Sequence, residues 1–430
     1  MLQTNLFQKL SAPFGQFSQI LLMRLYAAAA SFALTMLLGR LLGPDGFGAY
    51  VFALGLVSIA VLFTTFGFQH LAVRTLPQML VRKAQDEASG FILGTFLAVS
   101  VLSVTVCALA IWNVPLLAQD TVVQGTVAAA AGLLLVRSLN LMRTGVLQGL
   151  GRPIAGHLPD RLIEPSVLLI AVLVWVYVTS DISPRTAMFL TAGASLLSLL
   201  IGLHSLRRAI RSIWHPPDFS KARDWVIEAG KSSVLFGAAT LLGATDVIML
   251  GYLSTPEETG LYGVAARFFL LVSLPFHAAG VRISQQAAKL HAENDLAGLE
   301  TLSRGLANRM LLATLALAIP STVAALYIEV IFGAGFSAAA TPLLILVWLR
   351  VVISAAGVPG PILANTRHVG TTAMTVVAAT ALNIVLNGML APRFGANGAA
   401  AATVVSLALM TVGHSVMLRR RLGIYSFVTR

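Results

Sequence analysis

Long apolar segments recur along the whole chain, and short polar stretches separate them. A segment such as SVLLIAVLVWVYV is apolar almost throughout, so it lacks the alternation of polar and apolar residues that marks a transmembrane β-strand. About 20 apolar residues cross a bilayer as one helix. The pattern therefore predicts an all-α, polytopic membrane protein with twelve transmembrane helices, near residues 18–41, 48–71, 90–112, 122–145, 162–179, 186–206, 226–251, 259–281, 309–332, 341–358, 369–391 and 396–418.

Two stretches of the chain are similar to one another. LLGRLLGPDGFGAYVFA at residues 37–53 and MLGYLSTPEETGLYGVA at residues 249–265 are identical at seven of 17 positions. Similarity at a fixed offset indicates duplication. Each stretch joins the first two helices of one half, so the repeat predicts two parallel six-helix lobes around a central cavity that work by alternating access. The predicted lobes are residues 1–206 and 226–430, joined by a basic cytoplasmic linker at 207–225.

Composition and charge support this class. Hydrophobic residues make up 57% of the chain and charged residues 11%, against about 25% charged in soluble proteins, which excludes an ordinary soluble fold. If the N-terminus is cytoplasmic, the inner segments hold 21 of the 29 Lys and Arg residues, Arg143 among them, and the outer segments hold three. This asymmetry predicts that both termini are cytoplasmic. The basic loops lack interleaved aromatic residues, so no nucleic-acid partner is predicted.

Three segments carry a resemblance to a known family: LLGRLLGPDGFGAYVFALGLVSIAVLFTTFGFQHLAVRTLPQ, TDVIMLGYLSTPEETGLYGVAARF and LNIVLNGMLAPRFGANGAAAATVVS. They resemble the polysaccharide-biosynthesis, Wzx-like flippases of the multidrug/oligosaccharidyl-lipid/polysaccharide exporter (MOP) superfamily. The resemblance implies a MATE-like, V-shaped pair of lobes. It implies a flippase that moves an undecaprenyl-diphosphate-linked oligosaccharide across the bacterial inner membrane for surface polysaccharide, exopolysaccharide or lipopolysaccharide synthesis. It also implies membrane lipids and other polysaccharide assembly proteins as partners, and it leaves Na⁺ and H⁺ open as coupling ions.

Basic residues inside predicted spans are the first candidates for function, because a charge within a membrane is costly unless it is paired or faces water. Lys231 lies near the inner edge, where its side chain is expected to reach the headgroups. We predict that the others line the cavity and bind the substrate diphosphate, since a guanidinium group matches phosphate oxygens in geometry and charge. The alternative is that each caps a helix, pairs with an acid or binds lipid phosphate. These residues are Arg24, Arg137, Arg267 and Arg350.

Asp246 is the most deeply placed acid of the C-terminal half, and Arg267 reaches a similar depth on the next predicted helix. We predict an ion pair between them, which either fixes helix packing or couples transport to an ion. Asn383 and Asn387 share one face of a later helix. Packing between helices is the first interpretation of these amides, and contact with sugar is the alternative.

Three charged residues open the fifth predicted helix at the inner interface: Asp160, Arg161 and Glu164. Asp160 and Glu164 are four residues apart and therefore share a face. We predict that the three residues close a cytoplasmic gate or cap the helix.

An enzyme is not predicted, because the chain lacks a Walker A loop, a nucleophile elbow and a dinucleotide-binding turn. Its eight His and one Cys show no zinc spacing, so no metal or cofactor is expected. The main alternative function is a multidrug/cation antiporter of the same superfamily. That function needs acids in the N-terminal cavity, where the first helix offers Arg24 and the spans of the next three carry no acid. A membrane-embedded enzyme would need a large outer loop or an acid cluster, and a major-facilitator transporter would need a basic loop signature that AVRTLPQMLVRKAQDEASG lacks.

Overall fold

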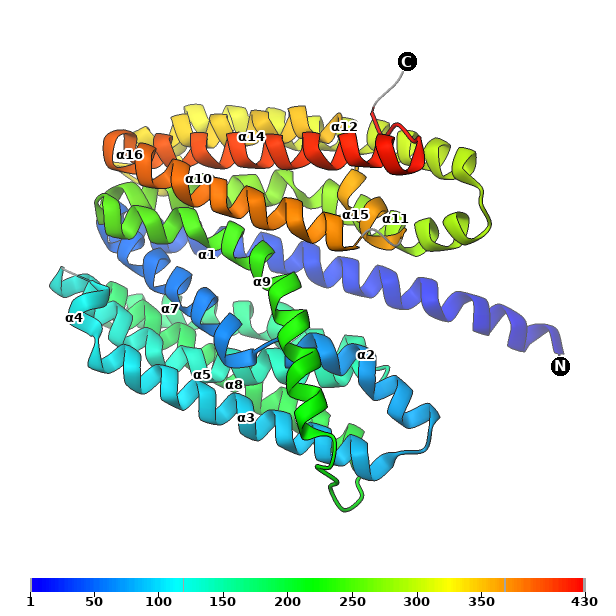
Figure 1. Ribbon diagram of the computed structural model, residues 1–430. Coiled ribbons are helices and arrows are strands. Elements are labelled where there is room, and N and C mark those ends of the chain that lie inside the picture. Colours follow the sequence, from blue (N-terminus) through cyan, green and yellow to red (C-terminus); the bar gives the residue numbers. More distant parts are fainter. Residues whose placement is uncertain (1, 119, 367–368, 428–430) are drawn as a thin grey trace. The chain divides into compact units, whose positions relative to one another are not determined.

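The computed structural model describes residues 2–118, 120–366 and 369–427, in which every regular element is a helix (Figure 1). Two basic residues of the predicted inner segments, Arg367 and Arg430, lie outside these ranges. The helices of the first half are α1 (Leu2–Thr65), α2 (Phe68–Val81), α3 (Gln85–Trp112), α4 (Val114–Leu117), α5 (Thr121–Gly149), α6 (Pro153–Leu158), η1 (Pro159–Ile163), α7 (Glu164–Thr179), α8 (Pro184–Ile210) and α9 (Ala222–Leu253). The second half contains α10 (Pro256–Val272), α11 (Leu274–Ala292), α12 (Leu296–Leu326), α13 (Ile328–Phe332), η2 (Ser337–Ala339), α14 (Ala340–Ser354), α15 (Pro359–Asn365) and α16 (Val369–Leu422).

The predicted all-α membrane class is confirmed. Among the described residues, eight helices are long and apolar enough to cross a membrane, or nine if the bent pair α10 and α11 forms one span. The two longest, α1 and α16, exceed a single crossing, and each contains a glycine with non-helical backbone: Gly43 (φ 67, ψ 177) and Gly395 (φ 53, ψ −132). A positive φ favours glycine, so these two residues allow the chain to turn between consecutive spans. The count of twelve spans stays a prediction.

The chain divides into two compact units. The first comprises Met1–Leu41 and Leu56–Gly237, and the second comprises Leu42–Gly55 and Ala238–Arg430. Helices α1 and α9 each contribute to both units. The predicted linker at 207–225 lies wholly in the first unit, and the chain passes to the second unit farther on, after Gly237 inside α9.

The first unit packs α2, α3, α5 and α8 around a core of buried apolar side chains (Figure 1). The linker is held against the start of α3. The amide of Asp218 donates to the Asp86 carbonyl at 3.1 Å, and Lys221 forms an ion pair with Glu87 at 2.7 Å. Because Asp86 and Glu87 occupy the first turn of α3, their charges are also favoured by the helix dipole.

The second unit sets α10, α12, α14 and α16 side by side (Figure 1). The two duplicated stretches meet here. A Cβ on Gly48 would overlap the carbonyl oxygen of Pro256, and a Cβ on Gly260 would overlap the carbonyl oxygen of Pro44. Gly48 corresponds to Gly260 in the repeat, and Pro44 corresponds to Pro256. The duplicated segments therefore pack against each other through the same two positions of each copy.

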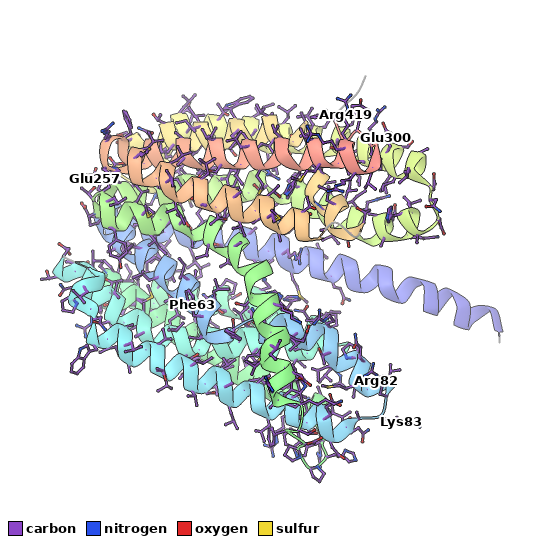
Figure 2. The ribbon with its side chains drawn as sticks, in the orientation of Figure 1. Phe63, Arg82, Lys83, Glu257, Glu300 and Arg419 are labelled. Atoms are coloured by element: carbon purple, nitrogen blue, oxygen red, sulfur yellow. The ribbon has the colours of Figure 1, made fainter. Side chains whose placement is uncertain are left out.

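The surfaces of the units suit a lipid environment. Phe63 is 61% exposed and projects from the flank of α1, whereas Arg82 and Lys83 occupy the turn between α2 and α3 (Figure 2). Arg419 lies in the last turn of α16 and stacks on Tyr425. Apolar flanks with charges at the helix ends are the arrangement that a bilayer favours.

Candidate functional site

Arg143 and Asp160 form a buried ion pair in the first unit. The side chain of Arg143 is 0% exposed, and its Nη2 donates to Oδ1 of Asp160 at 2.6 Å. Thr144 donates to Oδ2 of Asp160 at 2.8 Å, and Ser198 donates to Oδ1 at 2.9 Å. The guanidinium lies where a Cβ would stand on Gly202, so the small residue makes room for it. These contacts join α5, η1 and α8.

Arg137 forms a second ion pair, with Glu164. Nη2 of Arg137 lies 2.7 Å from Oε1 of Glu164, and the side chains are 41% and 8% exposed. The pair joins α5 to the start of α7, directly after the π-helical turn η1 that contains Asp160. π-Helical turns within α-helices occur frequently at functional sites.

Arg24 and Arg161 complete this group. Both are exposed, and Arg161 interacts electrostatically with Arg24, Arg137, Asp160 and Glu164. We call Arg24, Arg137, Arg143 and Arg161, together with Asp160 and Glu164, the arginine cluster. The cluster contains four guanidinium groups and two carboxylates, of which two pairs are in contact, so it carries a formal excess of positive charge. The structure thus brings two predicted diphosphate ligands together with all three predicted gate residues.

Arg143 counts among the basic residues of the predicted inner segments, and the structure places it inside α5 with a fully buried side chain. The available signal was its position, inside the predicted span at 122–145. Sequence reasoning could not see that Asp160, 17 residues later, folds back to neutralise it.

Asp246 lies fully enclosed in the second unit and accepts hydrogen bonds from four neutral side chains. Thr403 donates at 2.5 Å, Asn387 at 2.8 Å and Asn383 at 3.1 Å, and Tyr262 donates through its hydroxyl. The donors come from α10 and from both arms of α16. Arg267 is the predicted ion-pair partner of Asp246, whereas the hydrogen bonds to this carboxylate come from hydroxyl and amide groups.

The two asparagines have a further property. Their Oδ1 atoms are buried and have no hydrogen-bond partner among the described residues. Asn383 and Asn387 thus turn their amide NH2 groups to Asp246 and leave their own carbonyl oxygens without a donor. Arg267 lies half-buried on α10, the helix that also carries Tyr262.

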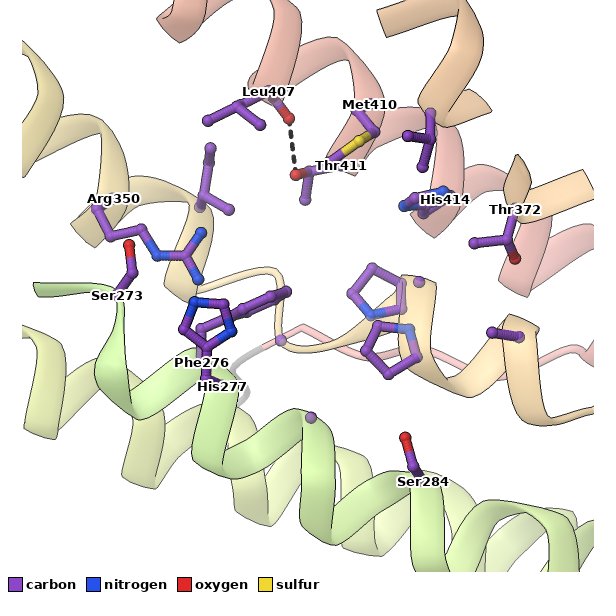
Figure 3. A pocket seen from close by; sticks show the side chains of 18 of the residues that line it. Ser273, Phe276, His277, Ser284, Arg350, Thr372, Leu407, Met410, Thr411 and His414 are labelled. Atoms are coloured by element: carbon purple, nitrogen blue, oxygen red, sulfur yellow. Dashed lines mark hydrogen bonds between the residues drawn. The ribbon is translucent and has the colours of Figure 1, made fainter. Parts of the chain in front are cut away.

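Arg350 lines a cavity of about 810 Å³ in the second unit, between α10, α11, α14, α15 and α16. It is 6% exposed, and its guanidinium carbon lies 4.1 Å from the centre of the Phe276 ring (Figure 3). Of the predicted diphosphate ligands, Arg350 is thus enclosed by apolar walls, whereas Arg24 and Arg137 lie in the arginine cluster.

Comparison with known proteins places the chain in a family. A family model described as polysaccharide biosynthesis protein matches residues 16–282. A probable low-salt glycan biosynthesis flippase, Agl15 of Haloferax volcanii, is 25% identical over 244 residues, which are 55% of this chain and 50% of the relative. The chain therefore matches about half the length of that curated relative.

Solved structures show the same fold. An inward-facing multidrug resistance MATE family transporter of the MOP superfamily is similar with a TM-score of 0.77 at 13% identity, over 92% of this chain and 94% of the other. The lipid II flippase MurJ in an inward closed conformation is similar with a TM-score of 0.65 at 15% identity, over 91% of this chain and 87% of the other. The chain therefore belongs to the polysaccharide biosynthesis protein family, and its fold is that of the MOP superfamily.

Proposed function

We propose that the protein is a flippase that moves an undecaprenyl-diphosphate-linked oligosaccharide across the bacterial inner membrane by alternating access, for surface polysaccharide synthesis. The observation that carries this proposal is the arginine cluster, with four guanidinium groups and two carboxylates on membrane-spanning helices. An excess of positive charge within spans is costly unless water or an anion compensates it. The diphosphate of a lipid-linked sugar is an anion that guanidinium groups recognise through paired hydrogen bonds.

The residues of the cluster take different parts. Arg143 is buried and paired, so it positions Asp160 and does not reach the substrate. Arg24 and Arg161 are exposed and supply charge to the diphosphate. The role of Arg267 as a diphosphate ligand stays a prediction. Arg137 is 41% exposed while it is paired with Glu164, so an arriving phosphate competes with the carboxylate for the guanidinium. Release of Glu164 from Arg137 is then the gating event that links substrate binding to the movement of α7.

The relatives support an anionic glycolipid substrate. One is named a probable glycan biosynthesis flippase, and one of the similar folds is a lipid II flippase. A multidrug antiporter is the second candidate, because the MATE transporter has the higher TM-score. The arginine cluster argues against a cationic drug, since a site with excess positive charge repels it. For coupling, we propose that Asp246, which accepts hydrogen bonds from Asn383 and Asn387, binds Na⁺ or H⁺.

Deletion of the gene followed by analysis of lipid-linked intermediates tests the function. We expect complete repeat units to accumulate on the inner leaflet. Complementation with Arg24→Ala or Arg137→Ala should restore flipping at least about tenfold less well than the wild type, because each loses a charge-assisted hydrogen bond of about 1.5–3 kcal/mol. Arg211→Ala removes the same charge from an exposed position outside the cluster and should complement fully.

If the Arg24→Ala and Arg137→Ala variants produce normal glycan at normal protein levels, the arginine cluster does not bind the substrate diphosphate. Unaltered glycan in the deletion strain, together with drug sensitivity, would favour the antiporter.

A further inference from the structure

Arg350 is a buried cation whose charge the described protein does not neutralise. Its Nε and Nη2 atoms are buried and lack a hydrogen-bond partner among the described residues. Arg143 and Arg137, by comparison, each lie within 2.7 Å of a carboxylate oxygen. The Phe276 ring faces the guanidinium of Arg350, but a ring accepts no N–H···O hydrogen bond and leaves the edge of the group open. A buried guanidinium group without a counterion is unfavourable, and a bound anion would neutralise its charge.

The unpaired atoms define the shape of that anion. Nε and Nη2 lie on one edge of the planar guanidinium group, and their N–H bonds point in parallel. This edge is the one that binds two oxygens of a single phosphate or carboxylate group.

The cavity beside Arg350 is much larger than a bare anion needs. Its volume is about 810 Å³, and its walls include Leu270, Val281, Ile353 and Val376. Among the described residues that line it, none is Asp or Glu. The occupant that neutralises Arg350 is therefore expected to come from outside the protein.

The polar groups far from Arg350 are already engaged. Asn365 donates to Ser284 at 3.1 Å and to the Pro361 carbonyl at 2.8 Å, and His414 is hydrogen-bonded to Thr375. Figure 3 shows His414 and Ser284 away from the guanidinium of Arg350, which stands over Phe276. The cavity thus has a cationic end at Arg350, and the rest of its wall is mostly apolar.

We propose that this cavity binds a phosphate-bearing lipid, with a phosphate on the Nε/Nη2 edge of Arg350 and an apolar chain along the rest of the cavity. A bare phosphate would occupy only the part of the cavity beside Arg350 and would leave the apolar walls without contacts. An apolar chain restores the contacts that an empty wall lacks. The site shares no residue with the arginine cluster, so lipid binding here can be tested separately from the proposed transport function; only an assignment of the lipid to substrate rests on that function.

Two lipids carry this chemistry: a polyprenyl phosphate, and a phospholipid of the bilayer. The test uses the purified full-length chain after removal of lipid. Thermal unfolding is followed with added polyprenyl phosphate, phosphatidylglycerol, diacylglycerol or inorganic phosphate, because a ligand that binds the folded state raises the Tm. We expect at least one of the two phosphate-bearing lipids to raise the Tm, and diacylglycerol and inorganic phosphate to leave it unchanged. A response to polyprenyl phosphate alone assigns the site to substrate, and a response to phosphatidylglycerol alone assigns it to bilayer lipid.

Two variants make the test specific. Arg350→Met keeps a side chain of similar length without charge and should weaken binding of the responding lipid at least tenfold. Arg419→Met removes a charge from the same unit outside the cavity and should bind as the wild type does. If Arg350→Met does not fold, Gly280→Leu serves instead: Gly280 lines the cavity, so the new side chain should exclude the lipid chain while Arg350 stays in place.

Equal stabilisation by diacylglycerol, a response to inorganic phosphate alone, or unchanged lipid binding by Arg350→Met would overturn the proposal. If the wild-type protein binds the lipid at Arg350 but does not flip the lipid-linked oligosaccharide, only the transport proposal is contradicted.

Discussion

Arg143 and Arg350 are both buried arginines on membrane-spanning helices, and their surroundings set different roles for them. Arg143 is neutralised by Asp160, and two hydroxyl groups complete the contacts of that carboxylate. Arg350 lies against an aromatic ring and an apolar cavity. Removing a buried charge from a pair leaves the partner uncompensated, whereas removing an unpaired charge relieves a cost. The same residue type is therefore structural in the first position and a binding group in the second.

Asp246 allows a residue-scale prediction that separates ion coupling from helix packing. If its carboxylate holds the coupling ion and that ion is Na⁺, the detergent-solubilised wild type should be stabilised by Na⁺ relative to choline, by about 2.7 kcal/mol at a hundredfold excess over Kd. Asp246→Asn keeps the size of the side chain and one acceptor oxygen but should lose this response. Asp45→Asn, at an exposed acid, should keep it.

The alternative outcomes are distinct. If H⁺ is the ion, lowering the pH should stabilise the wild type more than Asp246→Asn, with no effect of Na⁺. A less stable Asp246→Asn protein, with no ion response in either protein, would assign Asp246 to packing alone.

At the scale of elements, the duplicated stretches explain why glycine recurs at equivalent positions. Gly48 and Gly260 each face the backbone carbonyl of a proline in the other copy. A residue with a Cβ at either glycine would hold the two segments farther apart. The proline of each copy also stands beside a bend or a helix start, because Pro44 follows Gly43 and Pro256 begins α10. One duplicated motif thus supplies both the turn and the surface on which its copy packs.

Gly48→Ala and Gly260→Ala should each destabilise the protein, because the added Cβ must displace a backbone carbonyl. We expect a cost of about 1–3 kcal/mol, as for other overpacked sites. Thermal unfolding in detergent measures it. Gly305→Ala is the matched control in the same unit: nothing lies within 4 Å of its added Cβ, so it should be neutral or stabilising by up to about 1 kcal/mol. Equal behaviour of all three variants would show that the close approach of the two stretches is not required for folding.

At the scale of the whole molecule, the distribution of basic residues predicts the orientation in the membrane. The multi-pass character follows from the apolar helices, of which eight within the described part of the chain are long enough to cross. The predicted inner segments hold 21 Lys and Arg residues and the outer segments hold three. This asymmetry predicts the side of the membrane on which each loop lies. Cytoplasmic termini and an inner-membrane location are therefore proposals that topology mapping can test.

Single cysteines in a Cys107→Ala background provide that test, since Cys107 is the one cysteine of the chain. Cysteines at Asp45 and Glu257 should react in intact cells with a membrane-impermeant reagent, because both positions lie in predicted outer loops. A cysteine at Arg211 should react only after the membrane is opened. Labelling of Arg211→Cys from outside, with the other two protected, would reverse the predicted orientation.

Properties that depend on local sequence could be predicted before the structure. The apolar runs predicted an all-α membrane protein, and the predicted break between the spans 18–41 and 48–71 contains Gly43, which adopts a positive φ. The family was indicated separately, by the resemblance of three segments, and it is confirmed. The class and the break follow from local properties. These features are fixed by composition, helix period and backbone preference over a few neighbouring residues, so a single sequence is sufficient to read them.

The partners of the buried charges could not be predicted in this way. Asp246 accepts a hydrogen bond from Thr403, 157 residues away, and an aromatic ring stands against Arg350. The pattern of spans gives the depth of a residue but not its rotation about the helix axis or the helix that faces it. The sequence by itself determined that these charges lie within membrane helices. Only the packing of the helices decided which charge is neutralised and which stands open to a ligand, because a counterion acts over a few ångströms in space rather than along the chain.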